Sequence, residues 1–104
     1  MHNQGAKPVI RNGVVVVAVV QVEFYGIPRA RAGVVKVTAT AATLGDLILE
    51  LSSMMPALAE SCFEGRTLKA GYTANLRGDV FTTNPDTALR DGDAVLILSL
   101  DAGG

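Results

Sequence analysis

The sequence ends in two glycines, Gly103 and Gly104, and the carboxylate that follows them is the group in the chain best placed to react. Because glycine has no Cβ, a diglycine segment can enter a channel that is too narrow for other residues. Chain ends fray unless contacts hold them, so we expect residues 101–104 to form a flexible tail. Such a tail could carry its carboxylate into the active site of another protein.

Other potentially reactive side chains give little support for catalysis or metal binding. The single cysteine, Cys62, follows an amphipathic stretch and is expected to be a small buried hydrophobic residue rather than a reactive thiol. The single histidine, His2, lies within residues 1–12, which we expect to be a mobile lead-in. The sequence therefore predicts a protein that is not an enzyme, binds no cofactor of its own and holds no metal.

The composition indicates one globular domain, which we assign to residues 13–100. The whole chain has 104 residues, a length typical of a single domain. Nine basic and ten acidic residues give a net charge of −1, which disfavours binding to nucleic acid or to an anionic membrane. The apolar run at residues 14–20 is too short to cross a membrane. One cysteine fits a reducing compartment, so we expect a cytoplasmic protein.

The first half of the domain is predicted to be a hairpin followed by a helix. Residues 14–25 are rich in β-branched and aromatic side chains and indicate a strand, and residues 34–40 indicate a second one. Residues 26–33 are expected to turn the chain between them. A helix is then indicated by apolar residues at helical spacing, namely Leu44, Leu47, Ile48, Leu51 and Met55. Thr43 should cap this helix, with Asp46 in its first turn, and Pro56 should end or kink it before a possible short turn at residues 57–63.

The second half is predicted to contain three shorter strands. Residues 71–76 and 79–82 flank a turn at Arg77-Gly78, and residues 94–100 form the last strand after the Asp91-Gly92-Asp93 turn. This order predicts an α+β fold, with a mixed sheet of four to five strands and one main helix packed across one face. It matches the ubiquitin-like β-grasp, in which the last strand lies centrally beside the first.

The last strand is apolar on both faces. Val95 and Ile97 alternate with Leu96, Leu98 and Leu100, so one set can pack beneath the helix while the other faces outward. We expect the three leucines to face outward and to bind a partner, together with Asp101 and Ala102 of the tail. Coverage of this face by another element or by a second copy of the chain is an equal alternative.

Four stretches, in this order, resemble the ThiS/MoaD-type sulfur-carrier family: VEFYGIPRARAG (22–33), TLGDLILEL (43–51), ANLRGDVF (74–81) and LRDGDAVLILSLDAGG (89–104). The last stretch resembles the family's ending, with a Gly-Asp turn, an apolar strand and a terminal Gly-Gly. The chain departs from the family at Ser99, Leu100 and Asp101, where proline or small apolar residues are frequent. Its N-terminal extension through Asn12 is also longer than usual.

The resemblance implies a carrier protein that acts as a co-substrate. A ubiquitin-activating-type enzyme would use ATP to adenylate Gly104, with Gly103 giving access to its channel. A persulfide sulfur donor would then convert Gly104 to a thiocarboxylate, for consumption by a sulfur-accepting synthase. The family includes the small subunit of molybdopterin synthase and a thiamine-pathway carrier. A ubiquitin-like protein modifier or a non-catalytic β-grasp binding module is the alternative, because a modifier needs the same diglycine and activation.

Overall fold

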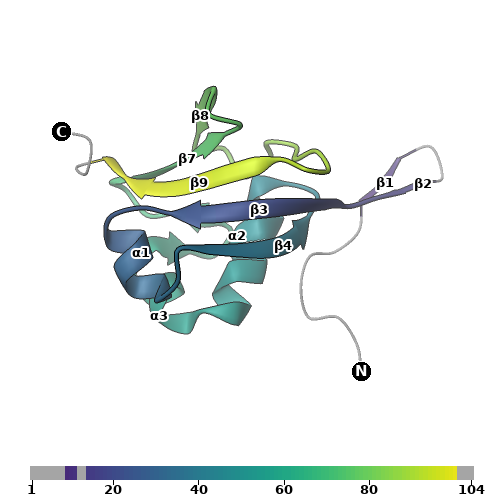
Figure 1. Cartoon of the computed structure of the whole chain (residues 1–104). Helices are drawn as coiled ribbons and strands as arrows, with labels where there is room; N and C mark the ends of the chain where they lie inside the picture. Colours follow the sequence, from purple (N-terminus) through teal and green to yellow (C-terminus); the bar gives the residue numbers. More distant parts are fainter. Residues whose placement is uncertain (1–8, 12–13, 101–104) are drawn as a thin grey trace.

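The computed structural model describes residues 9–11 and 14–100, which form one main sheet with helices against it (Figure 1). The main sheet consists of β3 (Ala18–Phe24), β4 (Lys36–Ala41), β7 (Tyr72–Leu76), β8 (Val80–Thr82) and β9 (Ala94–Ser99). The helices are α1 (Ile27–Ala32), α2 (Leu44–Met54) and α3 (Pro56–Cys62). Two small antiparallel pairs join β1 (Val9–Arg11) to β2 (Val14–Val16), and β5 (Phe63–Glu64) to β6 (Thr67–Leu68).

The last strand, β9, lies in the middle of the sheet, whose order is β4-β3-β9-β7-β8. It runs parallel to β3, with Val22 opposite Val95, and antiparallel to β7, with Ala74 opposite Ile97. A central strand exchanges hydrogen bonds on both sides and carries few charged residues, which accounts for the apolar sequence of β9. The predicted α+β, ubiquitin-like β-grasp fold with a mixed sheet is confirmed.

The strand predicted at residues 14–25 is two strands, because β2 and β3 have different partners. β3 begins at Ala18, which pairs with Ala41 at the end of β4. Beyond that point β4 offers no partner, and β2 pairs instead with β1, with Val16 opposite Val9. Part of the predicted lead-in is therefore a paired strand. Residues 1–8 and the Asn12-Gly13 turn lie outside the described residues.

The connection at residues 26–33, predicted as a plain turn, contains helix α1. Pro28 lies in the first turn of this helix, where its missing N–H costs no hydrogen bond, and its side chain is buried. Gly33 ends the helix at φ +76°, a left-handed conformation, and its N–H donates to the carbonyl of Arg29. The strands on either side still pair as an antiparallel hairpin, as predicted.

Helix α2 begins and ends where the sequence predicts. The Thr43 hydroxyl oxygen accepts a hydrogen bond from the Asp46 N–H at 3.2 Å, so Thr43 is the N-cap. The helix ends at Met54, and Pro56 starts α3 in the region predicted to form another short turn. No helix of the described residues is long and apolar enough to span a membrane.

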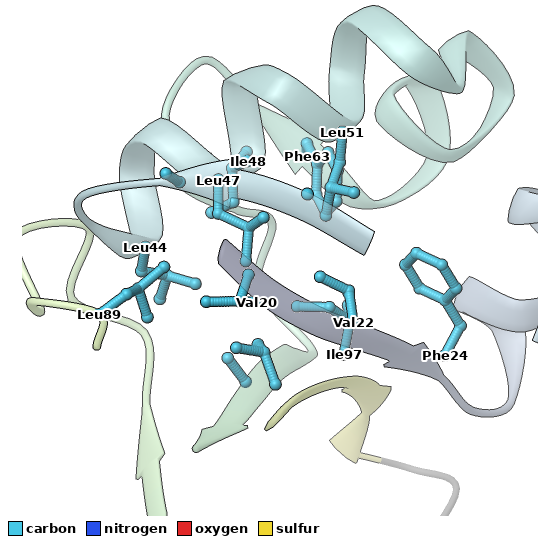
Figure 2. Close-up of a cluster of buried hydrophobic side chains, with 14 of the residues drawn as sticks. Val20, Val22, Phe24, Leu44, Leu47, Ile48, Leu51, Phe63, Leu89 and Ile97 are labelled. Carbon is cyan, nitrogen blue, oxygen red and sulfur yellow. The ribbon is translucent and has the colours of Figure 1, made fainter. Parts of the chain in front are cut away.

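The core lies between α2 and the inner face of the sheet (Figure 2). From the helix side come four side chains with no exposed surface, Leu44, Leu47, Ile48 and Leu51. From the sheet come alternate residues of the central strands, Val20, Val22, Phe24, Val95 and Ile97, which are equally buried. This packing fixes the position of β9, because its inward side chains are enclosed by the helix.

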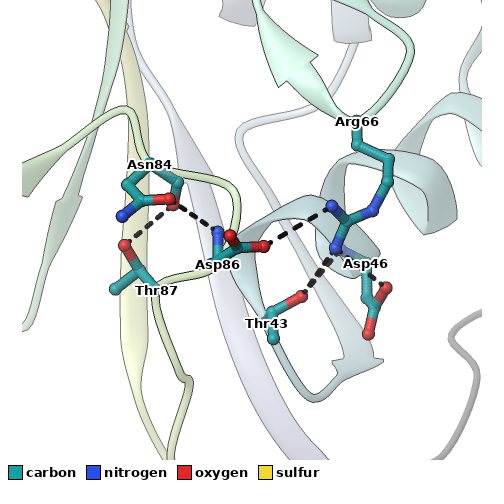
Figure 3. A network of polar contacts seen from close by, with 6 residues as sticks. All are labelled: Thr43, Asp46, Arg66, Asn84, Asp86 and Thr87. Atoms are coloured by element: carbon teal, nitrogen blue, oxygen red, sulfur yellow. Dashed lines mark hydrogen bonds and ion pairs between the residues drawn. The ribbon is translucent and has the colours of Figure 1, made fainter.

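Arg66 joins the start of α2 to the loop that precedes β9 (Figure 3). Its guanidinium lies 3.5 Å from Asp46 Oδ1 and 3.7 Å from Asp86 Oδ1, and it donates to the Thr43 hydroxyl at 3.4 Å. The Gly45 N–H also donates to the Pro85 carbonyl at 2.8 Å. These contacts connect the N-terminal end of α2 to the loop that precedes β9.

Candidate partner-binding face

The face of the sheet opposite the core, called here the outer face, carries the other side chains of β9. The structure places Val95 and Ile97 in the core, while Leu96 and Leu98 are partly buried on the outer face. Leu100 follows the strand and is 58% exposed. Three leucines named from the sequence thus lie outside the core, and their role in binding stays a prediction.

The strand register places Asn75 beside Leu96, and Phe81 on the far side of Asn75. Asn75 on β7 lies opposite Leu96 on one side and opposite Phe81 of β8 on the other. Phe81 is 65% exposed, which is unusual for a large apolar side chain. Phe81, Leu96 and Leu98 are called here the apolar patch. Neither Phe81 nor Asn75 was predicted from the sequence as part of a binding face, although an asparagine between Ala74 and Leu76 in a strand was a signal.

The part of the outer face on β3 and β4 is mostly polar. On β3 and β4, the Gln21 side-chain amide donates to the Thr38 hydroxyl at 3.0 Å. Glu23 lies opposite Lys36 in the strand register. The outer face therefore has a mostly polar half on β3 and β4, apart from the exposed Val19, and carries the apolar patch on β9 and β8. Such a boundary between polar and apolar surface is typical of protein interfaces.

The residue that precedes the tail is held by the domain. Leu100 donates its backbone N–H to the carbonyl of Gly71 at 2.8 Å, immediately after the end of β9. This contact fixes the place at which the tail begins. Asp101, Ala102, Gly103 and Gly104 lie outside the described residues, so the flexibility predicted for residues 101–104 and their chemical roles stay predictions.

Helix α1 carries two arginines, Arg29 and Arg31, in its last turn. The structure holds Arg29 against its own domain: its Nε donates to the Phe24 carbonyl at 2.9 Å. Its guanidinium also lies 5.2 Å from the centre of the Tyr25 ring, a cation–π distance. Arg31 is exposed in the last turn of the same helix. A structural role therefore accounts for Arg29.

Cys62 is fully buried at the end of α3, as predicted. Burial raises the pKa of its thiol, because the thiolate would lose its hydration in the core. A thiol with a raised pKa is a poor nucleophile at neutral pH. Among the described residues, histidine, cysteine, aspartate and glutamate form no group of three that could hold a metal ion. His2 lies outside those residues.

The sequence and the structure were compared with those of known proteins. The amino-acid sequence matches no protein-family model and no curated protein. Among solved structures, SAMP1 from Haloferax volcanii is similar with a TM-score of 0.71 and 22% identity, over 84% of this chain and 100% of that chain. CysO from Mycobacterium tuberculosis is similar with a TM-score of 0.64 and 27% identity, over 77% of this chain and 97% of that chain.

A third similar structure was solved as part of an assembly. It is a chain of the BexX/CysO complex from Amycolatopsis orientalis, with a TM-score of 0.68 and 24% identity, over 82% of this chain and 99% of that chain. All three neighbours are covered almost completely, so the similarity extends over the whole β-grasp domain. The chain therefore shares the ubiquitin-like β-grasp fold of these three neighbours, which agrees with the resemblance of its sequence to the ThiS/MoaD-type family.

Proposed function

We propose that the chain is a sulfur-carrier protein whose Gly104 is adenylated and then converted to a thiocarboxylate. The observation that carries this proposal is the position of β9: the central strand leads directly through Leu100 to the sequence Asp-Ala-Gly-Gly. A tail that leaves a rigid strand gives a partner a fixed reference for locating the reactive end. Similarity to CysO in fold supports the same reading.

The proposed chemistry needs an activating enzyme, because a carboxylate is a poor acyl donor. The Gly104 carboxylate attacks the α-phosphate of ATP, and pyrophosphate leaves. A persulfide sulfur then attacks the acyl carbon and AMP leaves. A thiol cleaves the resulting S–S bond, which forms a disulfide and releases the thiocarboxylate. The chain contributes the acyl group and the access of Gly103 and Gly104 to a narrow channel; it binds no cofactor and acts as co-substrate rather than enzyme.

The partners of this function are an adenylating enzyme of the ubiquitin-activating type, a persulfide sulfur donor and a sulfur-accepting synthase. We propose that Leu96, Leu98 and Leu100, with Asp101 and Ala102, bind the first and last of these. The similar chain in the BexX/CysO assembly supports docking of such a domain onto an enzyme of a sulfur-transfer pathway. The receiving pathway is cofactor or metabolite biosynthesis, with molybdopterin and thiamine synthesis as candidates, in the cytoplasm.

A ubiquitin-like protein modifier is the second candidate, because SAMP1, a small archaeal modifier protein, has a similar fold. A modifier forms an amide between Gly104 and a lysine instead of a thiocarboxylate. Intact-mass analysis of the protein purified from its native host distinguishes the two. Replacement of one terminal oxygen by sulfur supports the carrier, and a lysine-linked conjugate supports the modifier. Absence of both, in cells that contain the activating enzyme, would refute activation of Gly104.

A further inference from the structure

Asn75 lies on the outer face, yet its side chain is almost fully buried. Its exposed fraction is 6%, and its Oδ1 is buried without a hydrogen-bond partner in the described part of the chain. Directly opposite are Leu96 on β9 and Phe81 on β8, whose side chains donate no hydrogen bonds. The amide oxygen thus has no hydrogen-bond donor among its cross-strand neighbours.

The fold alone does not explain this amide. Buried polar atoms normally have a hydrogen-bond partner, and one that lacks it destabilises the folded chain. Thr73, two residues earlier on the same face, contrasts with Asn75, because its hydroxyl lies 3.4 Å from the Thr82 carbonyl. A leucine of similar size at position 75 would fill the same space without an unpaired acceptor. The amide is therefore explained better by a donor that comes from outside the described residues.

The surroundings of Asn75 indicate where that donor comes from. Phe81 is 65% exposed and Leu96 and Leu98 are partly buried, so a partner that covers the apolar patch also covers the amide. The four residues that follow Leu100 span at most about 14 Å. A protein that encloses Gly104 must therefore lie close to the end of β9, next to this patch. The adenylating enzyme meets that condition.

We infer that Asn75 determines specificity for the adenylating enzyme, by accepting a hydrogen bond from an N–H or O–H group of an otherwise apolar enzyme surface. This inference rests on the proposed function. An apolar contact alone discriminates poorly between similar partners, whereas a buried acceptor rejects any surface that has no donor at the matching position. Asn75 acts on recognition and does not contact the reacting atoms.

The inference is tested by Asn75→Leu in the full chain, with the adenylating enzyme of the source organism. In ATP–pyrophosphate exchange, the KM for the carrier should rise about tenfold while kcat stays unchanged, since one hydrogen bond of recognition is lost. Thermal unfolding of the isolated variant should occur at the same or a higher temperature, because an unpaired acceptor has been removed. Asn75→Ala, which adds no volume, should raise KM in the same way.

Gln21→Leu is the matched control, since it makes the same amide-to-leucine change on the polar half of the outer face. Its KM should equal that of the unchanged chain. An unaltered KM in Asn75→Leu, while Leu98→Asp raises it, would overturn the inference and leave the proposed function intact. A lower unfolding temperature with unaltered KM would show that Asn75 has only a structural role. If the unchanged chain supports no exchange, the proposed function fails and the inference fails with it.

Discussion

Replacing Leu98 by aspartate is expected to weaken binding of the adenylating enzyme and to leave the fold intact. Complete burial of a leucine stabilises by about 1.5–3 kcal/mol. Leu98 is already partly buried in the free chain, so about 1 kcal/mol remains to be gained on docking. An aspartate would forfeit this gain and would add at least about 1–2 kcal/mol, because an unpaired carboxylate costs more to desolvate than a neutral polar group. The total is at least about 2 kcal/mol, which corresponds to at least roughly 30-fold weaker binding.

The same substitution should cost the isolated domain about 1–3 kcal/mol, from the area that Leu98 already buries and the poor strand propensity of aspartate. The domain should stay folded, because position 98 lies on the outer face and a charge there stays in contact with water. Calorimetric titration with the enzyme and thermal unfolding of the free chain measure the two effects. Thr38→Asp, on the polar half of the outer face, is the control and should bind normally. Unfolding of free Leu98→Asp, or unchanged affinity, would refute the assignment of this face.

Three further predictions concern the tail, the core and the buried thiol. Deleting Gly104, or replacing Gly103 by valine, should leave thermal unfolding unchanged but abolish ATP–pyrophosphate exchange, because a misplacement of about 1 Å can cost on the order of a hundredfold in rate. Leu51→Ala should lower the free energy of unfolding by about 2–5 kcal/mol in urea, since Leu51 has no exposed surface. The raised pKa of Cys62 means that the folded state holds this proton more tightly. The free energy that the buried neutral thiol contributes to folding should therefore be complete below pH 9.0, the ordinary pKa of a thiol, and be lost as the pH rises through the folded pKa. Cys62→Ala should flatten that part of a plot of unfolding free energy against pH.

The elements that the sequence predicted well are those with local signals. Helix α2 has its N-cap at Thr43, apolar residues at helical spacing and a proline two residues after its last residue. Each of these signals acts within a few residues, so no knowledge of the tertiary structure is needed. The central position of β9 was predicted from the order of the elements, which matches the β-grasp, and the apolar sequence of the strand agreed with it.

Helix α1 was missed because its six residues carry no helical pattern of apolar side chains. Isolated helices of this length are unstable, and only packing can keep them folded. Pro28 is buried in the fold, and the Arg29 side chain donates a hydrogen bond to the carbonyl of Phe24 at the end of β3. Both interactions form only when the tertiary structure is in place. Phe81 and Asn75 were missed for the same kind of reason, since their nearness to Leu96 depends on the register of three strands.

The arrangement of the sheet also separates rigid from adjustable parts of the candidate interface. β9 pairs with β3 on one side and with β7 on the other, and Val95 and Ile97 anchor it in the core. Leu96 and Leu98 are therefore presented by a fixed backbone, as is Asn75 on the neighbouring strand. Phe81 belongs to a three-residue edge strand that pairs on one side only. Because edge strands have fewer constraints, Phe81 is the residue best able to adjust to different partners, while the selection between partners rests with the residues on the fixed strands.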